Sequence, residues 1–130
     1  MTGGVSFSNR LLSIVAPLNS GNSAAAALDT AHNAVQVTLN GSTQEFAASQ
    51  VTAIFFESGF GGGDTFVNST NILGIEYGWG GNNNFTAGSG QDDMFLWRNG
   101  NTVNNPSVDT WPSPSLTAAR TPSTAASLTF

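Results

Sequence analysis

Apolar residues recur at a nearly fixed interval through residues 35–104, and polar residues, glycine and asparagine fill the intervals. Two columns of such positions can be written, with members 18 to 20 residues apart. The first column is Val37, Phe56, Ile75 and Met94; the second is Phe46, Phe66, Phe85 and Val103. An interval of this length accommodates two short strands and two turns. The spacing therefore predicts stacked coils of β-strand, each burying its apolar residues against the next.

A glycine-aromatic-glycine motif is repeated in the same register. The segment GFGGGDTFV at 59–67 is matched by GWGGNNNFT at 78–86, 19 residues later, and more weakly by LWRNGNTVN at 96–104. Spacing and motif together predict an all-β chain, a right-handed parallel β-solenoid of about four coils of 18–19 residues, similar to a β-roll or β-helix. An antiparallel sandwich of hairpins, with Asn40 and Gly41 in one tight turn, is the alternative, but it does not explain the aligned motifs.

Composition divides the chain into three zones. Residues 1–34 are expected to form a cap or an assembly strand, residues 35–104 the repeat core, and residues 105–130 a tail rich in proline, serine and threonine. Proline lacks a backbone N–H for a sheet ladder, so the tail is not expected to supply a central strand. The alanine-rich stretch 23–31 is compatible with a short helix.

Charged residues are scarce in this chain. Only 8% of the residues are charged, lysine and cysteine are absent, and the formal net charge is −5. Without a basic patch, we expect no nucleic-acid partner and no attraction to an anionic membrane surface. No apolar run approaches the ~20 residues that membrane insertion requires. The absence of cysteine permits an extracellular or cell-surface location by a route that avoids disulfide folding.

Two nine-residue segments carry glycine, aspartate and an apolar residue at fixed places. Segment 59–67 does so with Gly59, Gly62, Asp64 and Phe66, and segment 87–95 with Gly88, Gly90, Asp92 and Met94. These segments resemble the nonapeptide repeats of RTX, or haemolysin-type, calcium-binding proteins, whose pattern is G-G-x-G-x-D-x-U-x. The resemblance implies a secreted or cell-surface protein whose turns bind calcium. The implied ligands are Asp64, Asn83, Asp92 and Asp93.

The aspartate column of these repeats is only partly kept, because Asn83 and Asn101 stand where aspartates would follow Asp64. Calcium takes six to eight oxygen ligands, several of them anionic, and this column supplies one carboxylate. Stacked side-chain amides that bond from coil to coil are the alternative, and they would make calcium dispensable for folding. Both explanations stand at this point, and calcium is the only cofactor that the sequence suggests.

No arrangement of residues in the sequence points to catalysis. The single histidine, His32, is expected in a turn outside the repeats and is assigned to the surface. Glu57 and Glu76 occupy equivalent places one interval apart, so their carboxylates are expected to share one face of a sheet. Such a pair can act as acid and base in a glycosidase, hold a cation or face water. Because nothing else forms a water-excluding cleft, we expect a non-catalytic protein with no catalytic residues.

Phe60, Trp79 and Trp97 form a third column, at the glycine-rich turns and at the start of the weaker third copy of the motif. If exposed, these rings form a strip that can stack on a polysaccharide or on another protein. If the tail or the N-terminal zone covers them, they form a second core. Coverage or protein contact is favoured over sugar binding.

Open strand edges are expected at both ends of the repeat core, and the chain has no lysine to guard them. The best candidate for an added edge strand is the apolar run of Leu11, Leu12, Ile14 and Val15. The sequence therefore predicts a non-catalytic extracellular structural protein that self-associates into a surface or matrix assembly, filament-like in form. A calcium-dependent adhesin or carbohydrate-binding module is the alternative.

Overall fold

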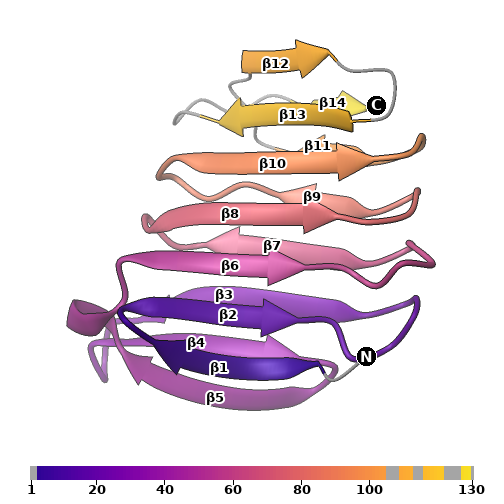
Figure 1. The fold of residues 1–130 in the computed structure, drawn as a ribbon. Coiled ribbons are helices and arrows are strands. Elements are labelled where there is room, and N and C mark those ends of the chain that lie inside the picture. Colours follow the sequence, from indigo (N-terminus) through magenta and orange to yellow (C-terminus); the bar gives the residue numbers. More distant parts are fainter. Residues whose placement is uncertain (1–2, 105–108, 113–115, 122–126, 130) are drawn as a thin grey trace.

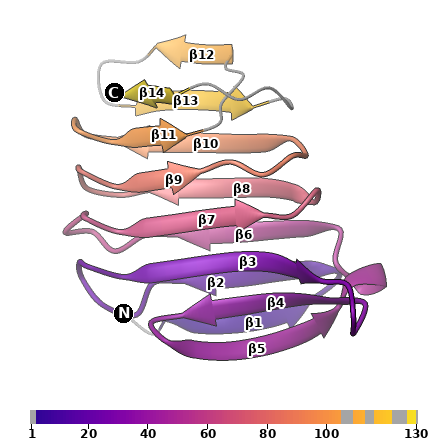
Figure 2. The same cartoon turned by 180° about the vertical axis from the view of Figure 1, so that it is seen from behind.

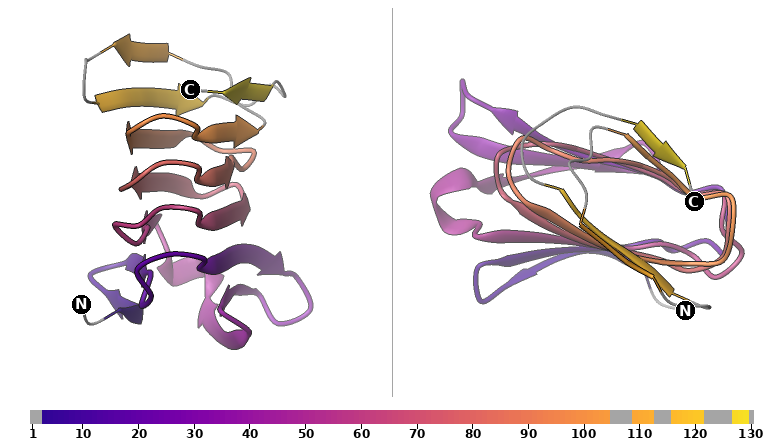
Figure 3. Two further views of the ribbon diagram at one scale, coloured as in Figure 1. Left: turned by 90° about the vertical axis from the view of Figure 1, so that its right-hand side faces the viewer. Right: turned by 90° about the horizontal axis from the view of Figure 1, so that it is seen from above.

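The computed structural model describes residues 3–104, 109–112, 116–121 and 127–129, which form two facing β-sheets (Figure 1). The first sheet has the spatial order β1 (Gly4–Ser8), β2 (Leu11–Val15), β6 (Ala53–Glu57), β8 (Leu73–Gly78), β10 (Asp92–Trp97), β13 (Leu116–Thr121) and β12 (Asp109–Pro112). The second has the order β14 (Ser127–Thr129), β11 (Thr102–Asn104), β9 (Asn84–Thr86), β7 (Thr65–Ser69), β3 (Ser23–Asp29), β4 (Ala34–Leu39) and β5 (Ser42–Ala47). A short 3-10 helix, η1 (Ala48–Gln50), follows β5. In the view from above, the two sheets form the long sides of a flattened section (Figure 3).

The sheets mix parallel and antiparallel strands, which overturns the predicted parallel β-solenoid. In the middle of the molecule, β2, β6, β8 and β10 pair in parallel, as do β3, β7, β9 and β11. At one margin the antiparallel pairs are β1 with β2, β3 with β4 and β4 with β5 (Figure 2). At the other margin they are β10 with β13, β13 with β12 and β11 with β14. The described strands do not form a closed solenoid, and the architecture is a two-sheet β-sandwich.

The interval that suggested stacked coils holds only across residues 53–104. Before that stretch, 42 residues separate Asn22 from its structural equivalent Asp64, because the β4–β5 hairpin and η1 are inserted between them. Asn40 and Gly41 form the two-residue turn of this hairpin with φ values of 48° and 85°. The sandwich alternative predicted a tight turn at this position, and that detail is confirmed.

One predicted apolar column breaks at Ile75, where the strand register differs by one residue; its other members, Val37, Phe56 and Met94, are buried as predicted. Phe56 pairs with Glu76 on β8, whereas Ile75 pairs with Phe55 and lies half-buried on the outward face. Successive strand residues face opposite sides, so a shift of one residue moves a side chain to the other face. The predictions that Ile75 is a core residue and that Glu57 and Glu76 share a face were therefore wrong. Glu57 is half-buried on the outward face and Glu76 is fully buried.

The second column is confirmed where it enters the core, at Phe66, Phe85 and Val103, which are fully buried. Phe66 stacks on Phe56 of the opposite sheet with ring centroids 4.6 Å apart and planes 5° apart. Phe85 meets Phe56 edge-on at 5.9 Å. Such pairs stabilise by about 0.5–1.5 kcal/mol beyond the burial of their area. These three phenylalanines therefore join the two sheets at the centre of the sandwich.

The N-terminal zone contributes core strands rather than a separate cap. Residues Leu11–Val15 form β2, which pairs with β1 on one edge and β6 on the other, and its alternate residues Leu12 and Ile14 are fully buried. This run is an inner strand with no free edge to offer a second molecule. The alanine-rich stretch forms strand β3 instead of a helix, because Ala24 and Ala26 alternate into the core beside the aromatic rings.

Part of the tail also joins the sandwich. Strand β13, which contains no proline, lies between β10 and β12 in the first sheet. This corrects the expectation that the tail supplies no central strand: the strand occupies a proline-free run of six residues. Across the described ranges, no helix is long and apolar enough to cross a membrane.

Candidate functional site

A ladder of buried polar side chains follows one end of the second sheet. Asn22, Asp64, Asn83 and Asn101 are buried, and each immediately precedes a strand: β3, β7, β9 and β11 respectively. Asn101 Oδ1 accepts a hydrogen bond from the Asn83 N–H at 2.9 Å, and Asn83 Oδ1 accepts one from the Asp64 N–H at 3.0 Å. Asp64 Oδ1 continues the series by accepting from the Asn22 N–H at 2.6 Å. Asp64, Asn83 and Asn101 thus each tie their own layer to the previous one.

The side-chain NH₂ group of each ladder asparagine donates a hydrogen bond to the backbone a few residues earlier in the sequence. Asn22, Asn83 and Asn101 each donate from Nδ2 to the carbonyl oxygen four residues earlier, at 2.9, 3.0 and 3.1 Å. The predicted asparagine ladder is therefore present, although its bonds run from side chain to backbone and not from amide to amide. Asn22 was missed, because the inserted hairpin moves it 42 residues from Asp64 and out of the regular interval.

Asp64 is the one carboxylate of this ladder, and N–H groups surround it. Oδ1 accepts from Asn22 N and Asn22 Nδ2, and Oδ2 accepts from Gly59 N at 2.6 Å. Calcium requires oxygen ligands, whereas the groups that face Asp64 here are hydrogen-bond donors. Asn83 Oδ1 is likewise engaged with a backbone N–H. As placed, Asp64 and Asn83 do not fit a calcium ion.

Asp92 and Asp93, the other two implied calcium ligands, lie where the chain returns from the second sheet to the first. Asp92 is fully buried; Oδ1 accepts from Asn68 Nδ2 at 2.8 Å and Oδ2 from Gly88 N at 2.7 Å. Asp93 points to the outward face, where Gln91 Nε2 donates to it at 3.2 Å. Asp64 and Asn83 lie at the opposite crossing between the sheets, so the four residues do not converge on one cation.

Glu76 is a carboxyl group within the apolar core. It is fully buried, and neither carboxyl oxygen receives a hydrogen bond from a donor group. Burial raises its pKa well above the ordinary value; the negative charge of Asp92, the contact of the two carboxyl groups and then the charge of Asp93 raise it further. The sequence placed this residue beside Glu57 on one face, because the 19-residue interval aligns the two glutamates, whereas in the strand register Glu76 pairs with Phe56.

The outward face of the first sheet carries a continuous group of aromatic rings, here named the aromatic face. Its members are Phe55, Phe60, Tyr77, Trp79, Phe95 and Trp97. Trp79 and Trp97 stack with centroids 4.2 Å apart and planes 17° apart. Tyr77 stacks on Phe95 at 5.0 Å and on Trp97 at 5.8 Å. The structure therefore brings the predicted strip of Phe60, Trp79 and Trp97 together and widens it with three rings.

The tail strands do not lie over the aromatic face. β13 and β12 extend the first sheet edge to edge beyond β10, and the second sheet packs on the opposite, inward face. Phe60, at the margin of the face, is 60% exposed, and the other five rings are half-buried. Because Trp79 and Trp97 stack on each other, one face of each ring is covered, and Trp79 Nε1 is buried without a hydrogen-bond partner.

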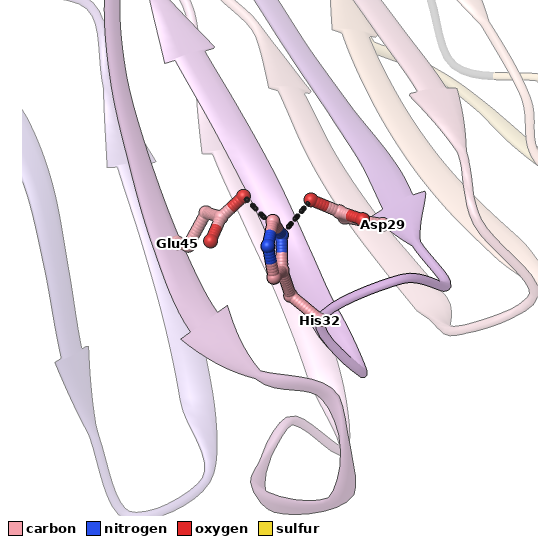
Figure 4. A group of neighbouring side chains, drawn as sticks. All are labelled: Asp29, His32 and Glu45. Atoms are coloured by element: carbon pink, nitrogen blue, oxygen red, sulfur yellow. Dashed lines mark hydrogen bonds and ion pairs between the residues drawn. The ribbon is translucent and has the colours of Figure 1, made fainter.

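A polar cluster lies on the second sheet at the β3–β4 turn (Figure 4). His32 Nδ1 lies 2.7 Å from Asp29 Oδ2 and 3.7 Å from Glu45 Oε1, and its side chain is 68% exposed, as expected of a surface residue. The hydrogen bond with Asp29 raises the pKa of His32, and the same bond lowers the pKa of Asp29. Within the described residues, Asp29, His32 and Glu45 are the one group of potential metal-ligating side chains close enough together to hold a metal ion. The imidazole-carboxylate contacts account for the cluster without one.

No family model, curated protein or solved structure matches this chain. The function must therefore be inferred from the chemistry of the sites themselves, since a fold alone does not specify one.

Proposed function

We propose that this protein is a non-catalytic structural protein of the cell surface or extracellular matrix that binds copies of itself through the aromatic face. The observation that carries this proposal is the continuous network of six rings on the outward face of the first sheet. A sheet face turned to water normally carries polar side chains, and a contiguous apolar patch on a protein surface indicates an interaction site.

The residue types on this face favour a protein partner. Tryptophan and tyrosine are enriched among the residues that contribute most to protein–protein affinity, and charged residues are depleted at the centre of such interfaces. On β6, β8 and β10 the outward residues include two carboxylates, Glu57 and Asp93, and no cation. Two copies can therefore pack their aromatic faces together without burying many charges.

The geometry of the rings favours self-association over sugar binding. A sugar stacks on an open aromatic face, whereas Trp79 and Trp97 cover each other's faces and Tyr77 stacks on Phe95. The ring surface that remains exposed, with Phe60 as its most exposed member, is suited to pack against the same surface of a second copy. A twofold pairing of this kind uses one patch on both molecules, which is the commonest arrangement in homodimers.

The buried polar groups support a structural role. The ladder residues form their hydrogen bonds with other groups of the fold, and Glu76 is fully buried. The margins of the two sheets, at β5 and β12, offer further strand edges for end-to-end growth into a filament. A location outside the cell agrees with the low charge and the absence of cysteine.

Sedimentation equilibrium over a series of concentrations tests the proposal. We expect the full chain to form dimers or larger species, and the triple variant Phe60→Ser, Trp79→Ser, Trp97→Ser to remain monomeric with its circular dichroism retained. The matched control is Leu18→Ser, Leu28→Ser, which removes two exposed apolar residues from outside the aromatic face and should leave association unchanged. A monomeric wild-type chain that binds an insoluble polysaccharide, with binding lost in the triple variant, would favour the carbohydrate-binding alternative.

A further inference from the structure

Glu76 occupies a core position on a central strand. β8 lies between β6 and β10, and in the two registers Glu76 pairs with Phe56 on one side and Met94 on the other. Phe56 and Met94 are buried, so a carboxyl group sits within a row of apolar side chains. An ionised carboxylate in such surroundings is strongly disfavoured unless it is paired with a cation or receives hydrogen bonds.

The Glu76 carboxyl group is directed toward a second buried carboxyl group. A side chain at position 74 would occupy the space that Gly74 leaves open: its Cβ atom would overlap Asp92 Oδ1 and lie 2.5 Å from Glu76 Oε1. The two carboxyl oxygens therefore converge on the same space beside Gly74. Glycine at this position is what allows both groups to enter the core.

The hydrogen bonds around this pair lack one donor. Both Asp92 oxygens accept hydrogen bonds, from Asn68 Nδ2 and from Gly88 N, as an ionised carboxylate does. Glu76 receives none. Two ionised carboxylates are acceptors only and repel each other, whereas a protonated Glu76 becomes a donor next to an acceptor.

No cation takes the place of that proton among the side chains of residues 3–104. The charged groups that act on the Glu76 carboxyl are Asp92 and Asp93 on β10, and both are acidic. On β6 the facing residue is Phe56, while Glu57 points outward. Arg10 donates to the Ser49 carbonyl and Arg98 is exposed in a turn. On β13, beyond β10, Arg120 stands opposite Asp93 in the backbone register.

We infer that Glu76 and Asp92 hold one proton between them in the core, and that its loss at higher pH loosens the layer of β8 and β10. In the protonated state Glu76 donates to Asp92, and on deprotonation the proton passes to solvent and two like charges remain buried together. The protein is therefore a pH-sensitive structure that is most stable in mildly acidic solution. This inference does not depend on the aromatic face or on self-association.

The direction of the pH dependence follows from the raised pKa of Glu76. In the unfolded chain Glu76 ionises near its ordinary pKa of 4.5, and in the folded chain only at a much higher pH. Between these two values the folded state binds one proton more than the unfolded state. The stability of the pair is complete below the ordinary value and is lost as pH rises through the folded pKa. Over this range the unfolding equilibrium constant should rise about tenfold for each pH unit.

Urea unfolding of the full chain from about pH 5 to about pH 8 tests the inference. The wild type and the Glu76→Gln variant share every other titratable group. The pH dependence due to Glu76 is therefore given by the ratio of the two unfolding equilibrium constants, wild type over variant. This ratio should rise about tenfold per pH unit. Glu57→Gln, a half-buried glutamate on the outward face, is the matched control and should follow the wild type. A ratio for Glu76→Gln that does not change with pH would overturn the inference.

A second measurement does not require the Glu76 variant to fold. The chain has three glutamates, Glu45, Glu57 and Glu76, so carbon-13 labelling of their carboxyl groups gives three resonances, two of which are assigned by substitution. The third, that of Glu76, should remain in its protonated position well above pH 4.5, the ordinary pKa of a glutamate. Loss of the Glu76 proton near that ordinary pKa would overturn the inference. A shift of the Glu76 resonance to its ionised position on addition of calcium chloride at fixed pH would also overturn the inference, because a cation would then neutralise the pair.

Discussion

The ladder of Asn22, Asp64, Asn83 and Asn101 and the pair of Glu76 and Asp92 are both buried, but their hydrogen bonding differs. In the ladder, one side-chain oxygen each of Asp64, Asn83 and Asn101 accepts a hydrogen bond from a backbone N–H of the neighbouring layer, and Asp64 receives three hydrogen bonds in all. Glu76 stands in a row of apolar core residues, and its carboxyl group receives no hydrogen bond from a donor group. The first region is a polar structure that stabilises the fold at the crossing between the sheets. The second stabilises it only while it keeps a proton.

The difference shows that burial alone does not set the value of a polar group. A buried acceptor with its donor contributes about 0.5–1.5 kcal/mol, and a buried group without one costs about 1–3 kcal/mol. The ladder residues each begin a strand, where the backbone N–H groups of the next layer are within reach. Glu76 lies in mid-strand, where the backbone N–H groups are committed to the sheet. Position along the strand therefore decides which polar residue is satisfied.

The largest effect is expected in the apolar core that both regions border. Phe66→Ala removes a fully buried ring that stacks on Phe56, and it should destabilise the protein by about 3–5 kcal/mol. Urea unfolding measures this loss. Val67, the next residue, is half-buried on the other face, and Val67→Ala should cost much less. Equal losses for the two variants would contradict the assignment of faces on β7.

The next effect concerns the carboxylate of the ladder. Asp64→Ala leaves the N–H groups of Asn22 and Gly59 buried without an acceptor, and we expect a loss of about 3 kcal/mol. Asp64→Asn keeps an acceptor for Asn22 and resembles the rest of the ladder, so about 1 kcal/mol is expected. Thermal and urea unfolding of both variants measure the difference. If alanine and asparagine at this position were equally stable, the ladder would not have the importance assigned to it.

A change of opposite sign is expected at Glu76. Glu76→Leu replaces the buried carboxyl by an apolar side chain of similar size, next to Phe56 and Met94. At neutral pH this should stabilise the protein by about 2 kcal/mol, because it removes the cost of a carboxyl group without a donor. Urea unfolding at pH 7 measures the gain. Destabilisation at neutral pH would show that the proton shared with Asp92 contributes more to stability than an apolar side chain of the same size.

The smallest effect concerns the exposed cluster. Because the contact lowers the pKa of Asp29, its stabilising effect is complete above the ordinary value of 3.8 and is lost on acidification. Because the contact raises the pKa of His32, its stabilising effect is complete below the ordinary value of 6.5 and is lost as pH rises. The contact is therefore strongest between these values. NMR titration should show the pKa of His32 above its ordinary value, falling back in Asp29→Asn. An unchanged His32 titration in that variant would disprove the contact.

The sequence predicted the polar ladder better than it predicted the architecture. Asp64, Asn83 and Asn101 recur at intervals of 19 and 18 residues, and side chains that begin successive parallel strands must lie in adjacent layers. Hairpins leave no such interval. The antiparallel margins formed by β1, β4 and β5 and by β12 to β14 were therefore invisible to a search for repeats, and the regular middle was extended over the whole chain.

The register of β8 was predicted wrongly for a physical reason that glycine supplies. Gly74 and Gly78 face the core, where apolar residues are expected, and Leu73, Ile75 and Tyr77 face outward, where polar residues are expected. The inward glycines make room for Asp92 and Phe85. Of the outward residues, Tyr77 belongs to the aromatic face. Hydrophobicity alone thus pointed to the opposite alternation, and the error concealed both Glu76 and the full extent of the aromatic face.

Photochemical cross-linking from position 60 tests the proposed self-association most directly. Phe60 is 60% exposed at the margin of the aromatic face, so its replacement by the photoreactive analogue benzoylphenylalanine should leave the fold intact. On illumination we expect covalent dimers whose cross-links, located by mass spectrometry, fall on Tyr77, Phe95 or Trp97 of the second copy. The same analogue at position 28, on the second sheet, should give few. An absence of cross-linked dimers at high concentration, or cross-links confined to β5 and β12, would contradict association through the aromatic face.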